Sequence, residues 1–190
     1  VDENATANLR TRRGKKRSIH TLLIRDLIQF YIESELHEHG AYLGDSLIES
    51  HPMMKDWECM TDLMIEEPGP EEEALDDRQE TSLIEIMVCA IKQASTCDSP
   101  VGRGPQRKQL TSKEQKTLHE DRMKISEHFI QVLPMLLNKY KTDPEKVANL
   151  LTIPQYLDLN VFSKQKDQLE NLLRLINEIV DIHSDKEVLE

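Results

Sequence analysis

Residues 111–151 read TSKEQKTLHEDRMKISEHFIQVLPMLLNKYKTDPEKVANLL and contain the clearest helix signals of the chain. Thr111 with Glu114 three residues later matches a capping box, in which two side chains satisfy the free backbone amides at a helix start. The spacing predicts one long helix from this point to about Tyr140. Pro134 is predicted to kink that helix, because its ring removes one backbone donor and crowds the preceding turn.

The second part of the stretch predicts a turn and a shorter helix. Asp143 followed by Pro144 is a typical helix cap with proline at the first helical position, and the helix is expected to run through Leu151. A proline-kinked helix, a short acidic turn and a second helix together resemble one HEAT unit, the helical hairpin that repeats along α-solenoids.

Outward from this stretch, apolar residues recur at helical spacing over most of the chain. The first helix is expected from Ser18 to about Tyr31, and further helices are expected over residues 35–49, 53–65 and 77–95. A last helix is expected from Ser163. The side chains predicted to face the core on the first and last of these helices are Ile19, Leu22, Leu23, Leu27, Phe30 and Tyr31, and Leu169, Leu172, Leu173, Ile176, Ile179 and Val180, respectively.

The composition supports an all-α fold. The 190 residues include only 6 glycines, and aromatic residues make up 4%, while leucine, isoleucine, glutamate, lysine and glutamine recur throughout, as is typical of helices. Helices joined by turns allow a closed bundle or an open stack of antiparallel pairs. The unequal helix lengths and long loops favour the stack, a HEAT-type α-solenoid.

Two basic segments and one acidic segment interrupt the helices. Residues 1–17 are expected to form a flexible basic arm, since they hold too few large apolar side chains to offset their ordering entropy. The helical block is then expected over residues 18–190, with an acidic loop at 66–77 and a basic connector at 95–110.

The basic segments are candidates for DNA contact, although the formal net charge of -11 opposes nucleic acid at long range. Neither segment has interleaved aromatic residues, which favours sequence-independent contact with the duplex backbone over stacking on single strands. Ordinary solvated charge is the alternative for both. The candidate residues are Arg10, Arg12, Arg13, Lys15, Lys16, Arg17, Arg103, Arg107 and Lys108.

Partner-binding candidates are the single tryptophan, Trp57, and the glutamate block of the acidic loop. Tryptophan is enriched at binding hot spots, but methionines at helical spacing around Trp57 favour a core position. A general acid or base needs partly desolvated surroundings that shift its pKa, and no apolar residues cover Glu71, Glu72 and Glu73 in this way. They are therefore expected to form a solvated loop that attracts a basic partner.

No motif in the sequence indicates chemistry of its own. His37 and His39 diverge by about 200° on a helix, at roughly 100° per residue, so one metal ion does not fit between them. The three cysteines lack metal-ligand or disulfide spacing. We expect no catalytic residue, no metal and no cofactor, and neither a membrane span nor a signal peptide is visible.

Several strings resemble the stromal antigen (stromalin) subunits of cohesin, in that family's order, from about Leu22 to Glu190. They are ESELHEHGAY at 33–42, KDWECMTD at 55–62, DRQETSLIE at 77–85, VGRG at 101–104, LTSKEQK at 110–116, EKVANLL at 145–151 and IPQY at 153–156. The resemblance implies an interior fragment of a much longer superhelical HEAT rod in the nucleus, on chromosomes including centromeric chromatin. Such a rod binds the kleisin subunit of the cohesin ring, helps the ring to associate with DNA and recruits cohesin regulators in sister chromatid cohesion.

Two hypotheses for this block follow. In the first, it is a non-enzymatic scaffold segment that holds an extended piece of the kleisin subunit and lies near DNA. In the second, it is a docking module for a regulatory protein or for another copy of the chain, through the acidic loop or the basic connector. A small-molecule substrate is expected in neither, and an enzyme ranks last.

Overall fold

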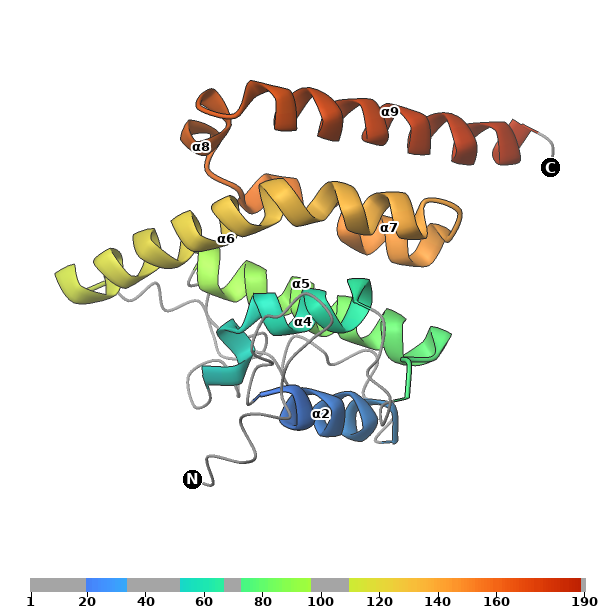
Figure 1. The fold of residues 1–190 in the computed structure, drawn as a ribbon. Coiled ribbons are helices and arrows are strands. Elements are labelled where there is room, and N and C mark those ends of the chain that lie inside the picture. The colour runs from blue at the N-terminus through green and yellow to red at the C-terminus, as the bar shows by residue number, and fades with distance from the viewer. Residues whose placement is uncertain (1–19, 34–51, 67–72, 97–109, 189–190) are drawn as a thin grey trace.

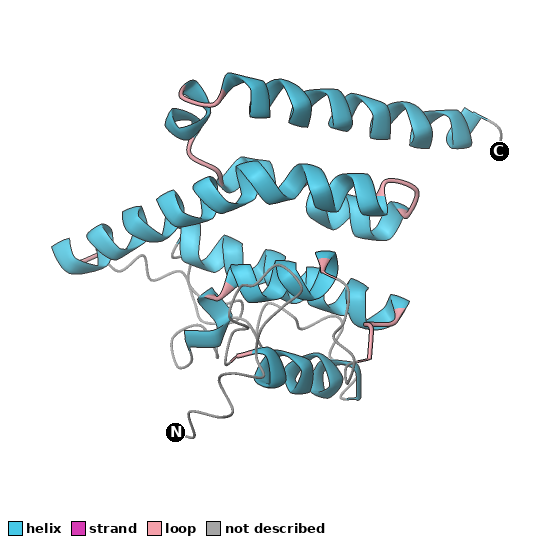
Figure 2. Ribbon diagram, in the orientation of Figure 1, coloured by secondary structure: helices cyan, strands magenta, loops and turns pink. Residues whose placement is uncertain are grey.

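The computed structural model describes residues 20–33, 52–66, 73–96 and 110–188, and within these ranges every regular element is a helix (Figure 2). The elements in chain order are α2 (Thr21–Glu33), the 3-10 turn η2 (Pro52–Lys55), α4 (Trp57–Ile65), α5 (Asp77–Thr96), α6 (Ser112–Tyr140), α7 (Pro144–Leu150), the 3-10 turn η3 (Ile153–Tyr156), α8 (Leu159–Ser163) and α9 (Lys166–Val188). The all-α prediction is confirmed.

The α6–α7 hairpin forms as residues 111–151 predict. The Thr111 amide donates to Glu114 Oε2 at 2.7 Å and the Glu114 amide donates to Thr111 Oγ1 at 3.3 Å, which completes the capping box. Asp143 caps α7, whose first residue is Pro144. The helix α6 continues through Pro134, and its two halves run in different directions in Figure 1.

The helix expected over residues 53–65 is divided, which corrects the prediction. Residues 52–55 form the turn η2, and α4 begins only at Trp57. The reason lies at Asp56, whose carboxylate accepts a bond from the Cys59 amide at 3.1 Å and so caps a new helix. Asp56 also lies 2.8 Å from His20 Nδ1, next to the start of α2.

The last helix also starts later than predicted. Ser163 ends the short helix α8, with its hydroxyl donating to the Asn160 carbonyl at 2.8 Å, and α9 begins at Lys166. The serine therefore closes one helix instead of capping the next, because a hydroxyl can serve a carbonyl behind it as well as an amide ahead of it.

The helices form an open stack and not a closed bundle. Figure 1 shows α2 at one end, then α4 with α5, then α6 with α7, and α9 at the other end. The main packing contacts join α2 to α5, α5 to α6 and α6 to α9. Packing between successive layers is the arrangement of an α-solenoid, as predicted.

One continuous apolar core runs through the stack. The central layer is covered on both sides, so that α5 buries seven apolar side chains: Leu83, Ile84, Ile86, Met87, Ala90, Ile91 and Ala94. Cys59 is buried, whereas Cys89 is only partly buried.

The predicted apolar faces of the two end helices are partly wrong. On α2, Ile24, Leu27, Ile28 and Tyr31 face the core, whereas Leu22 (73% exposed), Leu23 and Phe30 (55% exposed) do not. On α9, Leu172, Leu175 and Ile179 are buried, whereas Leu173 and Val180 are about half exposed. Each helix has apolar residues around more of its circumference than one neighbouring layer can cover.

Other predictions fall outside the described residues. These include the arm at 1–17, the cap at Ser18, the helix at 35–49 with His37 and His39, and most of the basic connector. Among the helices that are described, none is both long and apolar enough to cross a membrane.

Candidate functional site

Trp57 lies in the core. The side chain opens α4 and is only 5% exposed, in agreement with the core interpretation of this residue. Its indole nitrogen has no hydrogen-bond partner among the described residues. A role as a partner anchor stays a prediction, and it would require the layer around α4 to open.

The acidic segment is described only from Glu73 onward. Glu73 is exposed, and its carbonyl accepts a bond from Arg25 Nη2 at 2.9 Å, which ties the segment to α2. Asp76 caps α5, since its carboxylate accepts from the Gln79 amide at 2.8 Å. The remaining candidates lie outside the described residues: Glu71, Glu72, the six basic residues of the arm, and Arg103, Arg107 and Lys108.

A buried lysine joins three helices at the centre of the stack. Lys146 on α7 is 1% exposed, and its Nζ lies 2.6 Å from Asp77 Oδ1 on α5 and 2.7 Å from Asp143 Oδ2 in the α6–α7 turn. The same ammonium is 5.9 Å from the ring centre of Tyr140, the last residue of α6. Two carboxylates compensate the desolvation of one cation, so the cluster is satisfied.

This arrangement shifts the pKa values of its members. The hydrogen bond from Lys146 lowers the pKa of Asp143 below its ordinary 3.8. Burial alone would lower the pKa of Lys146, but hydrogen bonds to Asp143 and Asp77 outweigh burial and raise it. Burial, with Glu80 nearby, raises the pKa of Tyr140. All of these shifts favour the ionisation states that already prevail at neutral pH, so the cluster acts as a structural clamp.

Two further ion pairs connect neighbouring layers. Lys55 Nζ, just before α4, lies 2.7 Å from Asp121 Oδ2 on α6. Lys139 on α6 lies 3.8 Å from Glu80 Oε1 on α5 and donates to the Met64 carbonyl at the end of α4. These contacts fix how neighbouring layers are placed along one another. A periodic apolar pattern alone does not fix that placement.

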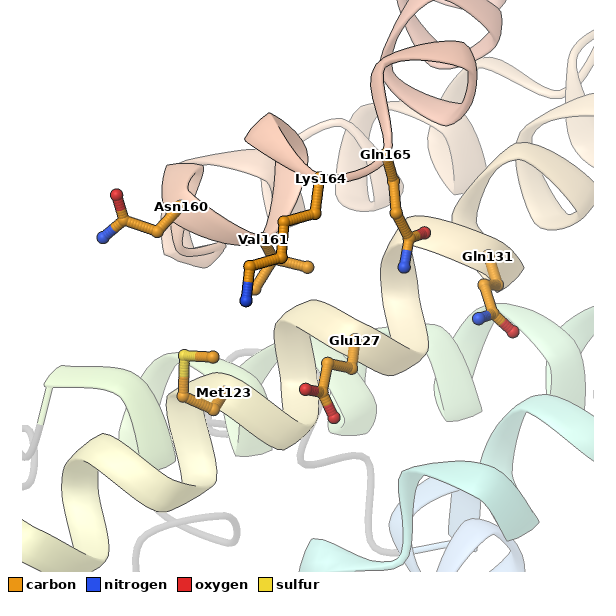
Figure 3. A pocket seen from close by; sticks show the side chains of 7 residues that line it. All are labelled: Met123, Glu127, Gln131, Asn160, Val161, Lys164 and Gln165. Atoms are coloured by element: carbon orange, nitrogen blue, oxygen red, sulfur yellow. The ribbon is translucent and has the colours of Figure 1, made fainter.

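A surface groove lies on the other side of α6. Met123, Glu127 and Gln131 succeed one another at intervals of four residues, and they form one wall of a cavity of about 300 Å³. Figure 3 shows these three residues along α6, with the short helix α8 and the turn that follows it on the other side of the pocket.

The opposite wall of the groove comes from α8 and the turn into α9. Val161 is buried at the base, and Asn160, Lys164 and Gln165 stand above it. This wall is fixed to α6, because the Asp158 amide, at the start of α8, donates to Ser126 Oγ at 2.7 Å. The groove therefore has walls from two segments that are far apart in the sequence.

Sequence reasoning missed this groove. The only signal was the row of residues at positions 123, 127 and 131 on the solvent face of a predicted helix, and such a row is equally typical of an ordinary exposed surface. No group of three histidine, cysteine, aspartate or glutamate side chains that could hold a metal ion occurs within the described ranges.

The fold defines a class of protein: a segment of an all-α solenoid built from layered helices. The family described as "Cohesin subunit SCC3/SA, HEAT-repeats domain" matches residues 42–190. The chain belongs to this family of cohesin subunits, as the resemblance predicted.

Cohesin subunits from three distantly related animals support this family membership. The chain is 50% identical to cohesin subunit SA-1 of Xenopus laevis over 100% of its own length and 15% of that protein. It is 44% identical to cohesin subunit SA-3 of Homo sapiens, over 86% of the chain and 13% of that protein. It is 38% identical to cohesin subunit scc-3 of Caenorhabditis elegans, over 88% of the chain and 15% of that protein. The chain thus spans about one seventh of the length of these relatives.

Proposed function

We propose that this chain is a non-enzymatic scaffold segment of a cohesin SCC3/SA subunit, which binds the kleisin subunit and supports the association of cohesin with chromatin in sister chromatid cohesion. The observation that carries the proposal is the combination of family membership with an open stack of helices. A stack of this kind buries its apolar surface between layers and leaves the sides free, so that an extended partner can lie across several helices.

The proposed place of action is the nucleus, on chromosomes, including centromeric chromatin. DNA contact would come from the basic residues of the arm and of the connector, which precedes α6 in the chain. Because the whole chain is acidic, such contact would be local and would weaken steeply with added salt.

Hydrogen exchange on the complete subunit, with and without the kleisin subunit, tests the main proposal. We expect slower amide exchange within residues 20–188 when the kleisin is bound, because contact and ordering both protect amides. Unchanged exchange over this whole range would contradict kleisin binding by this block and confine it to a spacer role. Capture of kleisin fragments by the subunit with and without this block is the complementary measurement.

A second candidate function is docking of a basic regulatory protein on the acidic segment. It is favoured by the exposure of Glu73 and Asp76, two acidic residues within four positions. Charge reversal at Glu73 and Asp76 should weaken such an association and flatten its salt dependence. If binding of the regulator and its salt dependence both stay unchanged, this second function is wrong.

A further inference from the structure

One residue of the turn between α6 and α7 makes two polar bonds to the outer helix α9. Lys141 Nζ lies 3.2 Å from Glu178 Oε1, and the Lys141 carbonyl accepts a bond from His183 Nε2 at 3.0 Å. Both partners belong to the second half of α9, where Ile179 is buried and Val180 is about half exposed. The placement of this half of α9 therefore depends on where the turn holds Lys141.

The same turn is fixed on its other side by the buried lysine. Lys146 Nζ donates to Asp143 Oδ2 at 2.7 Å and to Asp77 Oδ1, on α5, at 2.6 Å. Asp143 follows Lys141 by only two residues, and its amide donates to the Tyr140 carbonyl at 2.9 Å, which closes the turn. A displacement of Asp143 therefore moves Lys141 as well, because a closed turn of this length has little freedom to absorb it.

The two carboxylates that share the buried ammonium differ in exposure. The side chain of Asp77 is 88% exposed and that of Asp143 is 32% exposed, whereas the side chain of Lys146 is only 2% exposed. Solvent and dissolved ions therefore reach Asp77 first. A buried charge that loses one partner depends more strongly on the partner that remains, so the loss of Asp77 changes the bond between Lys146 and Asp143.

The arrangement of the layers places this turn on the path from α5 to α9. Figure 1 shows α6 and α7 between these two helices, and the main packing contacts join α5 to α6 and α7, and α6 to α9. Apolar packing is non-directional and tolerates small shifts, whereas a hydrogen bond weakens steeply as its geometry changes. The polar turn is therefore the part of this path that responds most to a small displacement.

We propose that the α6–α7 turn is a coupling device, which transmits the loss of the Asp77–Lys146 bond at α5 to the second half of α9. When Asp77 is neutralised or drawn away, Lys146 keeps only Asp143, and the turn readjusts. The bonds from Lys141 to α9 then weaken, so that the second half of α9 separates from α6 more often. The device lies within the block itself, needs no partner and is independent of the proposed function.

The chain offers variants that act on each end of this device. Asp77→Ala removes the exposed partner of Lys146, and Lys146→Met breaks both of its bonds while it fills a similar volume. Glu145→Ala is the matched control, because Glu145 is also an exposed acid in the first turn of its helix, whereas Lys146 Nζ bonds to the other two carboxylates. Glu178→Gln removes the charge that pairs with Lys141 on α9. Circular dichroism of each variant of the complete subunit checks that the fold is retained.

Amide hydrogen exchange of the complete subunit, at neutral pH and constant salt, measures the coupling. We expect Asp77→Ala to speed exchange within residues 175–184 by at least about twofold, the lower end of the coupling between groups in one polar network. Lys146→Met should act in the same direction. Glu145→Ala should leave exchange in this part of α9 unchanged.

The double variant of Asp77→Ala with Glu178→Gln tests whether the two ends are linked. We expect its exchange rates in α9 to lie below the product of the two single effects, because Glu178→Gln already removes a bond that Asp77→Ala weakens. Rates equal to that product would overturn the coupling. Faster exchange in α7 with unchanged exchange in α9, no effect of Asp77→Ala in either helix, or an equal effect of Glu145→Ala would each overturn it as well.

Discussion

The central helix α5 and the outer helix α9 are similar in length and apolar pattern, yet they differ in how fully they are covered. Layers on both sides of α5 bury seven of its apolar side chains, whereas α9 packs against α6 and α8, and its Leu173 and Val180 are about half exposed. The helix α2 at the other end resembles α9, with Leu22 and Phe30 exposed. Position in the stack, and not the helix sequence, sets the degree of burial.

The contrast extends to polar groups. At the centre, a fully buried lysine joins α5, α6 and α7 through two carboxylates. On the α8 side of α6, one acid, Glu127, and one base, Lys164, line an open pocket. Stability within this block is therefore expected to reside where apolar burial and ion pairing coincide, around α5, α6 and α7.

The largest expected effect comes from the same substitution made in a central and an outer helix. Leu137→Ala on α6 removes a side chain with no exposure, and should lower the free energy of unfolding by about 2–5 kcal/mol, because it leaves a cavity. Leu173→Ala on α9 should cost less than about 1 kcal/mol, since half of that side chain already contacts water. Urea denaturation of the two variants measures both values, and equal costs would contradict the contrast between the layers.

The buried lysine should give the next largest effect. Lys146→Ala removes two short bonds to carboxylates and leaves a cavity, so we expect a loss of about 2–4 kcal/mol. Lys146→Met fills the same volume and should cost less. Lys116→Ala is the control, because its ion pair with Glu120 is long and exposed, and such pairs contribute about 0–1 kcal/mol. Thermal unfolding ranks the three variants, and a neutral Lys146→Ala would show that the clamp is dispensable.

A smaller and local effect is expected at the start of α6, which projects from the stack (Figure 1). Thr111→Ala removes the hydroxyl that accepts the Glu114 amide in the capping box. The free energy of unfolding should fall by about 1 kcal/mol. Few tertiary contacts hold this end, so the first turns should fray and exchange their amide hydrogens faster. Thr117→Ala, two turns further on, should leave exchange there unchanged. Equal exchange in the two variants would mean that packing, and not the cap, holds this end.

The smallest effect is the pH dependence of the Asp143 bond. The folded pKa of Asp143 lies below its ordinary 3.8, so its ionised form stabilises the fold above that pH, and this contribution is lost as the pH falls through the folded pKa. Asp143→Asn keeps a good helix cap and removes the charge. The difference in stability between the native chain and this variant should shrink in acid. A difference that stays constant as the pH falls would refute the assignment.

Much of the fold was predictable because local chemistry decides it. The capping box at Thr111 and the Asp143–Pro144 cap both form as predicted, since each depends only on residues within one turn. The starts of α4 and α9 were misplaced, because serine and aspartate can close one helix or begin another. The bonds that decide between these roles include one from His20, which lies 36 residues away from Asp56.

The candidate site was much less predictable. Of the side chains proposed for partner binding, Trp57 is buried and Glu73 is exposed, and the others lie outside the described residues. The groove went unseen because its walls meet only when Asp158 bonds to Ser126 across 32 residues. No pattern within one helix carries that information.

The helical class, the main helix caps and the resemblance to cohesin subunits were predictable from the residues alone, because each depends on neighbouring residues or on whole strings. The covered apolar faces, the buried lysine and the pocket beside α8 became visible only once the helices were packed together. The physical reason is that burial and electrostatic pairing depend on the neighbours that each helix acquires in space, and several helices here carry more apolar surface than any one neighbour can cover.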